Sequence, residues 1–205
     1  MNESERLLYN INDDLFDLLS GLNDIPERYA VDIMKVMITV AIESGDLDRS
    51  ASMISSLKEK DSELAFLCSV DLEMKKGDHS KALSMIKAME RTGRPDVDLR
   101  AAGALGHLGR KDEAMELLDS MKDDIVKEGT VDGLDRVYIQ MADVCSVSND
   151  HDSEIKYLTK ALGVAADEGK RRIYGLLAAS YETIGMSEKA KEYYARSRIK
   201  ISCSS

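Results

Sequence analysis

Helix stop signals recur at a fixed interval along this chain, and they constrain its fold more than any other feature. Gly45, Gly77 and Gly109 are separated by 32 residues each. Glycine commonly ends a helix because it enters the left-handed backbone conformation without strain. Apolar residues three or four positions apart lie on both sides of each glycine, and this spacing places them on one face of a helix. The pattern predicts a series of helical hairpins.

The clearest hairpin lies near the C-terminal end of the sequence. Small Ala178 and Ala190 would allow its two helices to approach closely. Its residues are, in order, Leu177, Ala178, Tyr181, Gly185, Ala190, Tyr194 and Ser197. This order and spacing resemble the tetratricopeptide repeat (TPR) family. The resemblance implies an all-α protein that forms a right-handed α-α superhelix, a TPR-like solenoid of about eleven antiparallel helices with a concave surface.

The same resemblance implies one continuous domain over residues 26–204. Its five hairpins are expected at about 27–60, 61–94, 95–128, 135–168 and 171–204. Residues 1–25 are predicted to form an N-terminal capping helix, because Leu8, Ile11 and Leu15 continue at helical spacing. Other helical-pair repeats and an irregular bundle are the alternative architectures.

The fourth hairpin departs from the pattern. Its turn residue is Asn149, 40 residues after Gly109, and asparagine is the second choice for a left-handed helix end. We expect residues 122–133 to absorb the additional length as an extended helix end and a loop. Glu154 stands where a small residue is expected, so the packing of this hairpin stays open. Its second helix is expected to continue to about Glu168.

The composition favours helices and argues against some classes of partner. The 205 residues include only two prolines and 5% aromatic residues, and the abundant unbranched side chains lose little rotamer freedom in a helix. The net charge of −10 argues against nucleic acid and anionic membranes, because both attract basic surfaces. The most apolar run, residues 36–42, is too short to cross a bilayer, and no leader peptide is recognised. A cytoplasmic protein without membrane insertion is expected.

The sequence contains no recognised catalytic or cofactor-binding motif. A glycine-rich phosphate loop, a nucleophile elbow and a paired-cysteine zinc motif are all missing. The cysteines and histidines do not have the spacing of a metal site; they are Cys68, Cys145, Cys203, His79, His107 and His151. Cys68 and Cys145 fall on apolar helix faces, where buried packing is expected. The sequence therefore predicts a protein that is not an enzyme and has no cofactor and no metal.

The family resemblance also implies a binding surface on the first helix of each hairpin. The matching positions are Lys35, Thr39, Phe66, Val70, Leu99, Arg100, Arg136, Gln140, Asp143 and Arg172. Four of these residues are basic, and they favour a carboxylate-bearing peptide because arginine can hold a carboxylate through two hydrogen bonds. The alternative is that they are ordinary solvated residues. A chaperone-tail clamp is not expected, because Thr39 replaces the asparagine of that arrangement.

Two functions follow from this reasoning. The leading hypothesis is a non-enzymatic scaffold or adaptor whose concave groove binds a peptide or helix of another protein, with an acidic peptide as the favoured partner. The alternative is a structural homo-oligomer, such as a homodimer, assembled through the N-terminal helix or through complementary charged ends.

The charged ends give a test of the homo-oligomer hypothesis. Residues 1–48 hold eleven acidic and three basic residues, giving −8, while residues 171–205 hold three acidic and seven basic residues, giving +4. Opposite potentials steer association, and salt screens them. If the ends drive assembly, sedimentation will show an oligomer at low salt that dissociates at high salt. A monomer under both conditions contradicts this hypothesis.

Overall fold

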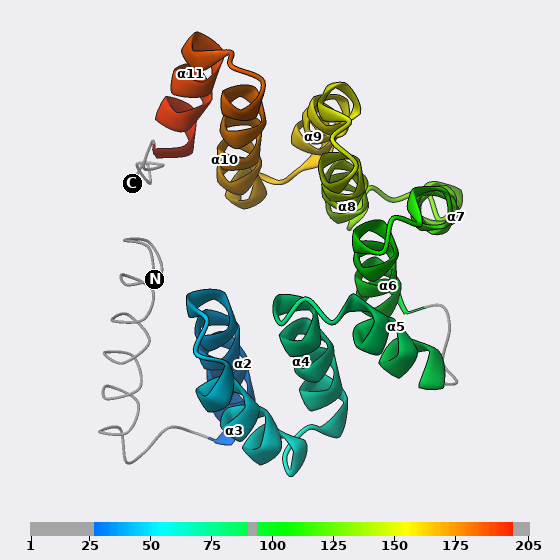
Figure 1. The fold of residues 1–205 in the computed structure, drawn as a ribbon, viewed down its shortest axis with the longest axis vertical. Coiled ribbons are helices and arrows are strands. Elements are labelled where there is room, and N and C mark those ends of the chain that lie inside the picture. The colour runs from blue at the N-terminus through cyan, green and yellow to red at the C-terminus, as the bar shows by residue number, and fades with distance from the viewer. Residues whose placement is uncertain (1–26, 90–93, 199–205) are drawn as a thin grey trace. The chain divides into compact units, whose positions relative to one another are not determined.

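The computed structural model describes residues 27–89 and 94–198 (Figure 1). Within these stretches the chain forms ten α-helices and no strands, which confirms the predicted all-α fold. The predicted capping helix of residues 1–25 lies outside the described residues, as do Cys203 and the end of the fifth hairpin. The chain divides into two compact units, Met1–Glu90 and Arg91–Ser205. Continuity of the array across both units stays a prediction, and each unit is described by itself.

The first unit contains two helical hairpins. They are formed by α2 (Glu27–Ser44) with α3 (Leu47–Lys58), and by α4 (Ser62–Lys75) with α5 (His79–Ala88). Helix α4 packs against both α2 and α3, so the second hairpin stacks on the first. Ile38, Ile54 and Leu72 are buried in one cluster that joins these three helices.

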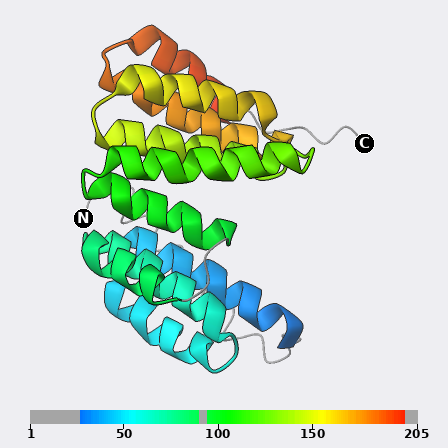
Figure 2. The same ribbon diagram turned by 90° about the vertical axis from the view of Figure 1, so that its right-hand side faces the viewer.

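The second unit contains the other three hairpins. They are formed by α6 (Pro95–His107) with α7 (Lys111–Lys127), by α8 (Leu134–Val147) with α9 (His151–Val164), and by α10 (Asp167–Thr183) with α11 (Ser187–Arg198). Helix α8 packs against α6 and α7, and α9 packs against α10. Figure 2 shows the helices of this unit stacked with their axes roughly aligned. The predicted helix extension and loop over residues 122–133 are confirmed, because α7 continues to Lys127 before the loop.

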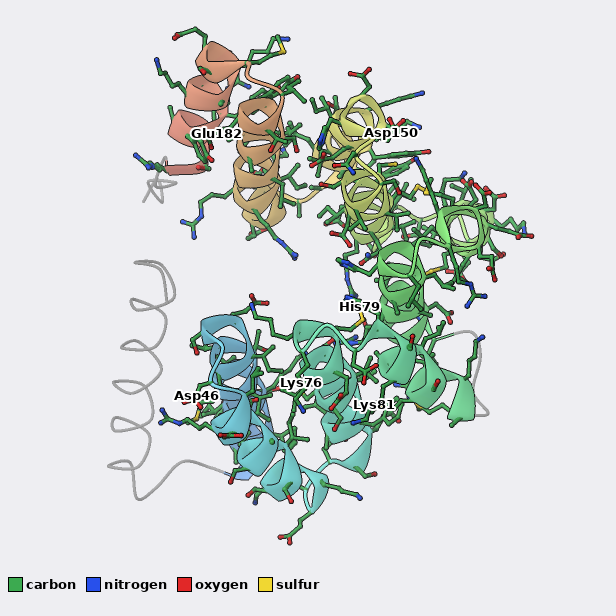
Figure 3. All side chains as sticks on the ribbon, in the orientation of Figure 1. Asp46, Lys76, His79, Lys81, Asp150 and Glu182 are labelled. Atoms are coloured by element: carbon green, nitrogen blue, oxygen red, sulfur yellow. The ribbon has the colours of Figure 1, made fainter. Side chains whose placement is uncertain are left out.

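The turns explain where the helices of each hairpin end and begin. Gly109 and Asn149 both adopt the left-handed conformation, with φ of +74° and +57°, as predicted. In several turns of this chain, an aspartate directly follows the residue with the left-handed conformation. The side chains of Asp46 and Asp150 accept hydrogen bonds from backbone N–H groups in the first turns of α3 and α9 (Figure 3), which stabilises these helix starts. Asp150 also accepts a hydrogen bond of 2.9 Å from Nζ of Lys111, at the start of α7.

The connection between α9 and α10 differs from the prediction. Helix α9 ends at Val164 instead of near Glu168, and Ala165 and Ala166 have extended backbones. Ala165 belongs to the buried cluster that α9 and α10 share, so the early turn allows an apolar side chain to leave water. Asp167 and Glu168 form the first turn of α10, where acidic side chains interact favourably with the helix dipole.

Two helical glycines give different predictions for alanine substitution. At Gly106 an added Cβ would lie 3.0 Å from Cγ2 of Val144, whereas at Gly175 it would meet no atom within 4 Å. Gly175→Ala is expected to raise the free energy of unfolding by about 1 kcal/mol through helix propensity. Gly106→Ala is expected to be about 1–3 kcal/mol less stable than Gly175→Ala because of crowding between α6 and α8. Urea denaturation followed by circular dichroism measures both, and equal changes would contradict the crowding.

Candidate functional site

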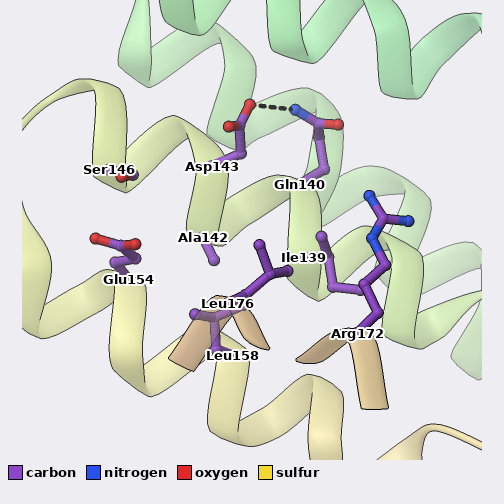
Figure 4. Close-up of a pocket in the computed structure, with 9 residues that line it drawn as sticks. All are labelled: Ile139, Gln140, Ala142, Asp143, Ser146, Glu154, Leu158, Arg172 and Leu176. Carbon is purple, nitrogen blue, oxygen red and sulfur yellow. Dashed lines mark hydrogen bonds between the residues drawn. The ribbon is translucent and has the colours of Figure 1, made fainter. Parts of the chain in front are cut away.

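A pocket of about 320 Å³ lies between α8, α9 and α10 in the second unit (Figure 4). The pocket is separate from the contact between α6 and α8, which pack directly against each other. It lies where α8 faces α10. Its lining is Ile139, Gln140, Ala142, Asp143, Ser146, Glu154, Leu158, Arg172 and Leu176. Three residues of the predicted binding surface, Gln140, Asp143 and Arg172, are therefore brought together.

Helical spacing directs these side chains toward the pocket. Gln140 and Asp143 are three residues apart on α8, and Arg172 and Leu176 are four residues apart on α10, so each pair shares a helix face. Nε2 of Gln140 donates a hydrogen bond of 3.0 Å to Oδ2 of Asp143, the contact drawn in Figure 4. This bond holds both polar groups on the α8 side of the pocket.

Glu154 lines the pocket from α9, and the sequence did not identify it as a site residue. Its side chain is buried. Oε1 accepts a hydrogen bond of 2.6 Å from the Ser180 hydroxyl on α10, and Oε2 lies 2.8 Å from Nδ1 of His151. The fourth hairpin therefore accommodates a glutamate at a small-residue position by directing its carboxylate toward α10. The departure from the repeat pattern was the signal that this position differs from the others.

The charges of the pocket are only partly balanced. Within the part of the chain that the structure describes, Arg172 forms no hydrogen bond or ion pair. Asp143 reaches the surface, but protein atoms around its carboxyl group raise the pKa of Asp143 by removing the group from water. Repulsion from Glu154 adds to this effect, while His107 and the Gln140 hydrogen bond oppose it. Among the described residues, the pocket thus presents an arginine without an ion pair, the carboxylate of Asp143, and a Glu154 carboxylate that already has two partners.

Two predicted arginines lie elsewhere in the second unit. Nη2 of Arg136 forms an ion pair with the carboxylate of Asp96, and Nη1 of Arg100 donates a hydrogen bond of 2.8 Å to the carbonyl oxygen of the same residue. Neither arginine is among the residues that line the pocket. Leu99 is buried, so it packs inside the protein and does not offer its side chain to a partner.

The remaining predicted residues belong to the first unit. Lys35 and Thr39 are exposed, and the Thr39 hydroxyl donates a hydrogen bond of 2.9 Å to the carbonyl oxygen of Lys35. Phe66 is half-buried. Val70 has no exposed surface, which is common for an apolar side chain. It therefore cannot supply the predicted apolar contact to a partner.

The described residues hold neither a metal-ligand cluster nor a membrane-spanning helix. In residues 27–89 and 94–198, no group of three or more His, Cys, Asp or Glu side chains is placed to hold a metal ion. None of the helices in these ranges is long and apolar enough to cross a membrane. Cys68 and Cys145 are buried, as predicted.

Comparisons with known proteins support the repeat assignment. The family model described as tetratricopeptide repeat matches residues 172–197. A tetratricopeptide repeat protein from Parabacteroides merdae ATCC 43184 superimposes with a TM-score of 0.54 at 14% identity, covering 95% of this chain and 79% of that chain. BtubC (BKLC) from P. vanneervenii gives a TM-score of 0.52 at 14% identity, covering 97% of this chain and 91% of that chain. No curated protein sequence matches this chain significantly. The last hairpin is therefore a tetratricopeptide repeat, and the chain has the fold of tetratricopeptide-repeat proteins.

Proposed function

We propose that this protein is a non-enzymatic interaction module that binds a segment of a partner protein in the pocket between α8 and α10. The observation that carries the proposal is the pocket of about 320 Å³, whose lining combines apolar side chains with two carboxylates and with Arg172, which has no ion pair within the described residues. Pockets that combine apolar walls with a few convergent polar groups are the usual binding sites of proteins. Stacked helical repeats commonly present such surfaces to other proteins.

The chemistry of the pocket bears on the predicted acidic partner. Asp143 and Glu154 accompany Arg172 in the lining, and Arg136 is already paired with Asp96. A segment that is acidic throughout would meet two carboxylates for one available arginine. An acidic partner stays a prediction for other surfaces of the protein, and the pocket favours a segment with charges of both signs.

Filling the pocket tests the proposal. Leu176 lines the pocket and is half-buried, so the indole of Leu176→Trp would occupy part of the space that a partner needs. Thr183→Trp introduces the same side chain at an exposed position of α10 outside the pocket lining. Affinity capture from the producing cells, quantified by mass spectrometry, should lose its specific partner with Leu176→Trp by about tenfold or more.

The control variant should capture the partner as the original protein does. Circular dichroism melting must show that both variants remain folded. Equal capture by Leu176→Trp and Thr183→Trp would remove the pocket as the binding site.

A further inference from the structure

The charges in the α8 to α10 pocket are separated by apolar side chains. In Figure 4 the Glu154 carboxylate and the Arg172 side chain lie on opposite sides of the pocket, with Leu176 and Ile139 between them. Asp143 lies on the α8 side, held by its hydrogen bond from Gln140. An occupant that satisfies Asp143, Arg172 and the apolar side chains needs a cation, an apolar stretch and an anion.

The volume limits how much of a partner can enter. A pocket of about 320 Å³ lies at the lower end of the range for ligand sites, and it accommodates a single residue better than a helix. One residue carries all three required groups at once. A lysine at the C-terminal end of a chain has an ammonium group, an aliphatic stem and a free α-carboxylate.

We propose that the pocket binds the C-terminal lysine of a partner protein. The α-carboxylate pairs with Arg172, whose planar guanidinium suits a carboxylate. The lysine ammonium lies at the carboxylate of Asp143, because both oxygens of the Glu154 carboxylate already have partners in Ser180 and His151. The methylene groups of its stem contact Leu158 and Leu176, as long cationic side chains commonly cover apolar surface. This inference rests on the proposed function, because it names the partner chemistry of the same site.

Charge complementarity distinguishes this occupant from related ones. A C-terminal glutamate would match Arg172 but would bring a second anion toward Asp143 and Glu154. A C-terminal leucine would bring no cation to Asp143. An internal lysine would leave Arg172, which has no ion pair within the described residues, without a carboxylate.

Short peptides test the inference on the full chain. We would titrate acetyl-Ala-Ala-Lys with a free carboxylate, the same peptide as its C-terminal amide, and acetyl-Ala-Ala-norleucine with a free carboxylate. Chemical shifts of the backbone amides that line the pocket report binding in ¹⁵N-labelled protein. The free lysine peptide is expected to bind at least about tenfold more tightly than either of the other two, because each lacks one charge-assisted contact. Differences of less than about threefold would overturn the inference.

Two variants assign the two charges of the lysine. Arg172→Gln should bind the free acid and the amide equally, whereas Arg171→Gln, at the adjacent exposed position, should keep the original preference. Asp143→Asn can still accept the Gln140 hydrogen bond and should lose most of the preference for lysine over norleucine. Preferences that survive both pocket substitutions would overturn the inference.

The test separates the inference from the proposed function. If no peptide binds while Leu176→Trp still abolishes partner capture, the pocket is a binding site and the C-terminal lysine is wrong. If Leu176→Trp leaves capture unchanged and no peptide binds, both the inference and the proposed function are wrong.

Discussion

Replacement of Leu177 by alanine is expected to lower the free energy of unfolding by about 2–5 kcal/mol. The Leu177 side chain has no exposed surface and belongs with Leu158 and Ile173 to the buried cluster shared by α9 and α10. Its truncation removes apolar contacts and leaves a cavity, because a densely packed interior collapses only partly around a missing group. Urea denaturation followed by circular dichroism measures the change.

Ile184→Ala is the matched control for this substitution. Ile184 follows α10 and keeps 37% of its surface exposed, so its truncation should cost about 0.5 kcal/mol or less. Equal effects of the two substitutions would mean that the Leu177 side chain does not carry the packing between α9 and α10.

The second large effect is expected at Ser180. Ser180→Ala should lower the free energy of unfolding by about 1–3 kcal/mol, because a buried carboxylate oxygen of Glu154 would lose the 2.6 Å hydrogen bond that it accepts. Glu154→Ala should cost less, because it restores a small residue and lets the Ser180 hydroxyl donate its single hydrogen to the carbonyl oxygen of Leu176, 3.0 Å away. The double variant should therefore be more stable than the sum of the single effects predicts, by about 1 kcal/mol.

Denaturation of the four proteins of this double-mutant cycle measures the coupling. Ser148→Ala is the control, since the Ser148 hydroxyl also donates to a backbone carbonyl of its own helix, that of Val144, but lies on the surface. Its effect should be within about 0.5 kcal/mol. Additive effects of Ser180→Ala and Glu154→Ala would show that the contact between α9 and α10 contributes nothing to stability.

The hairpins could be predicted from sequence because their signals are local. Gly109 and Asn149 end their helices through the backbone conformation of one residue, and the aspartate that often follows caps the next helix within three residues. Such features depend on few neighbours, so spacing alone indicates them. The early end of α9 was missed because burial of Ala165 in the core depends on tertiary packing.

The site was predicted less completely, because spacing indicates a helix face but not the depth of a side chain. Gln140 and Arg172, predicted from their repeat positions, line one pocket. Leu99 matched the same repeat position as a surface residue, yet it is buried. Arg136 pairs with Asp96, 40 residues away in the sequence, and no local pattern predicts which charges will meet across two helices.

Asp150 links the stability of the pocket to acidity. Its carboxylate accepts hydrogen bonds from Lys111 and from the backbone of Ser153, which hold the pKa of Asp150 below its ordinary value of 3.8. This contribution to stability is complete at pH values above the ordinary pKa of 3.8. It is lost as the pH falls through the lower pKa that Asp150 has in the folded protein. Helix α9 begins next to Asp150 and carries Glu154 into the pocket. Acid is therefore expected to loosen this wall of the pocket through fraying of the first turn of α9, at a pH below that at which Asp143, with its raised pKa, becomes neutral.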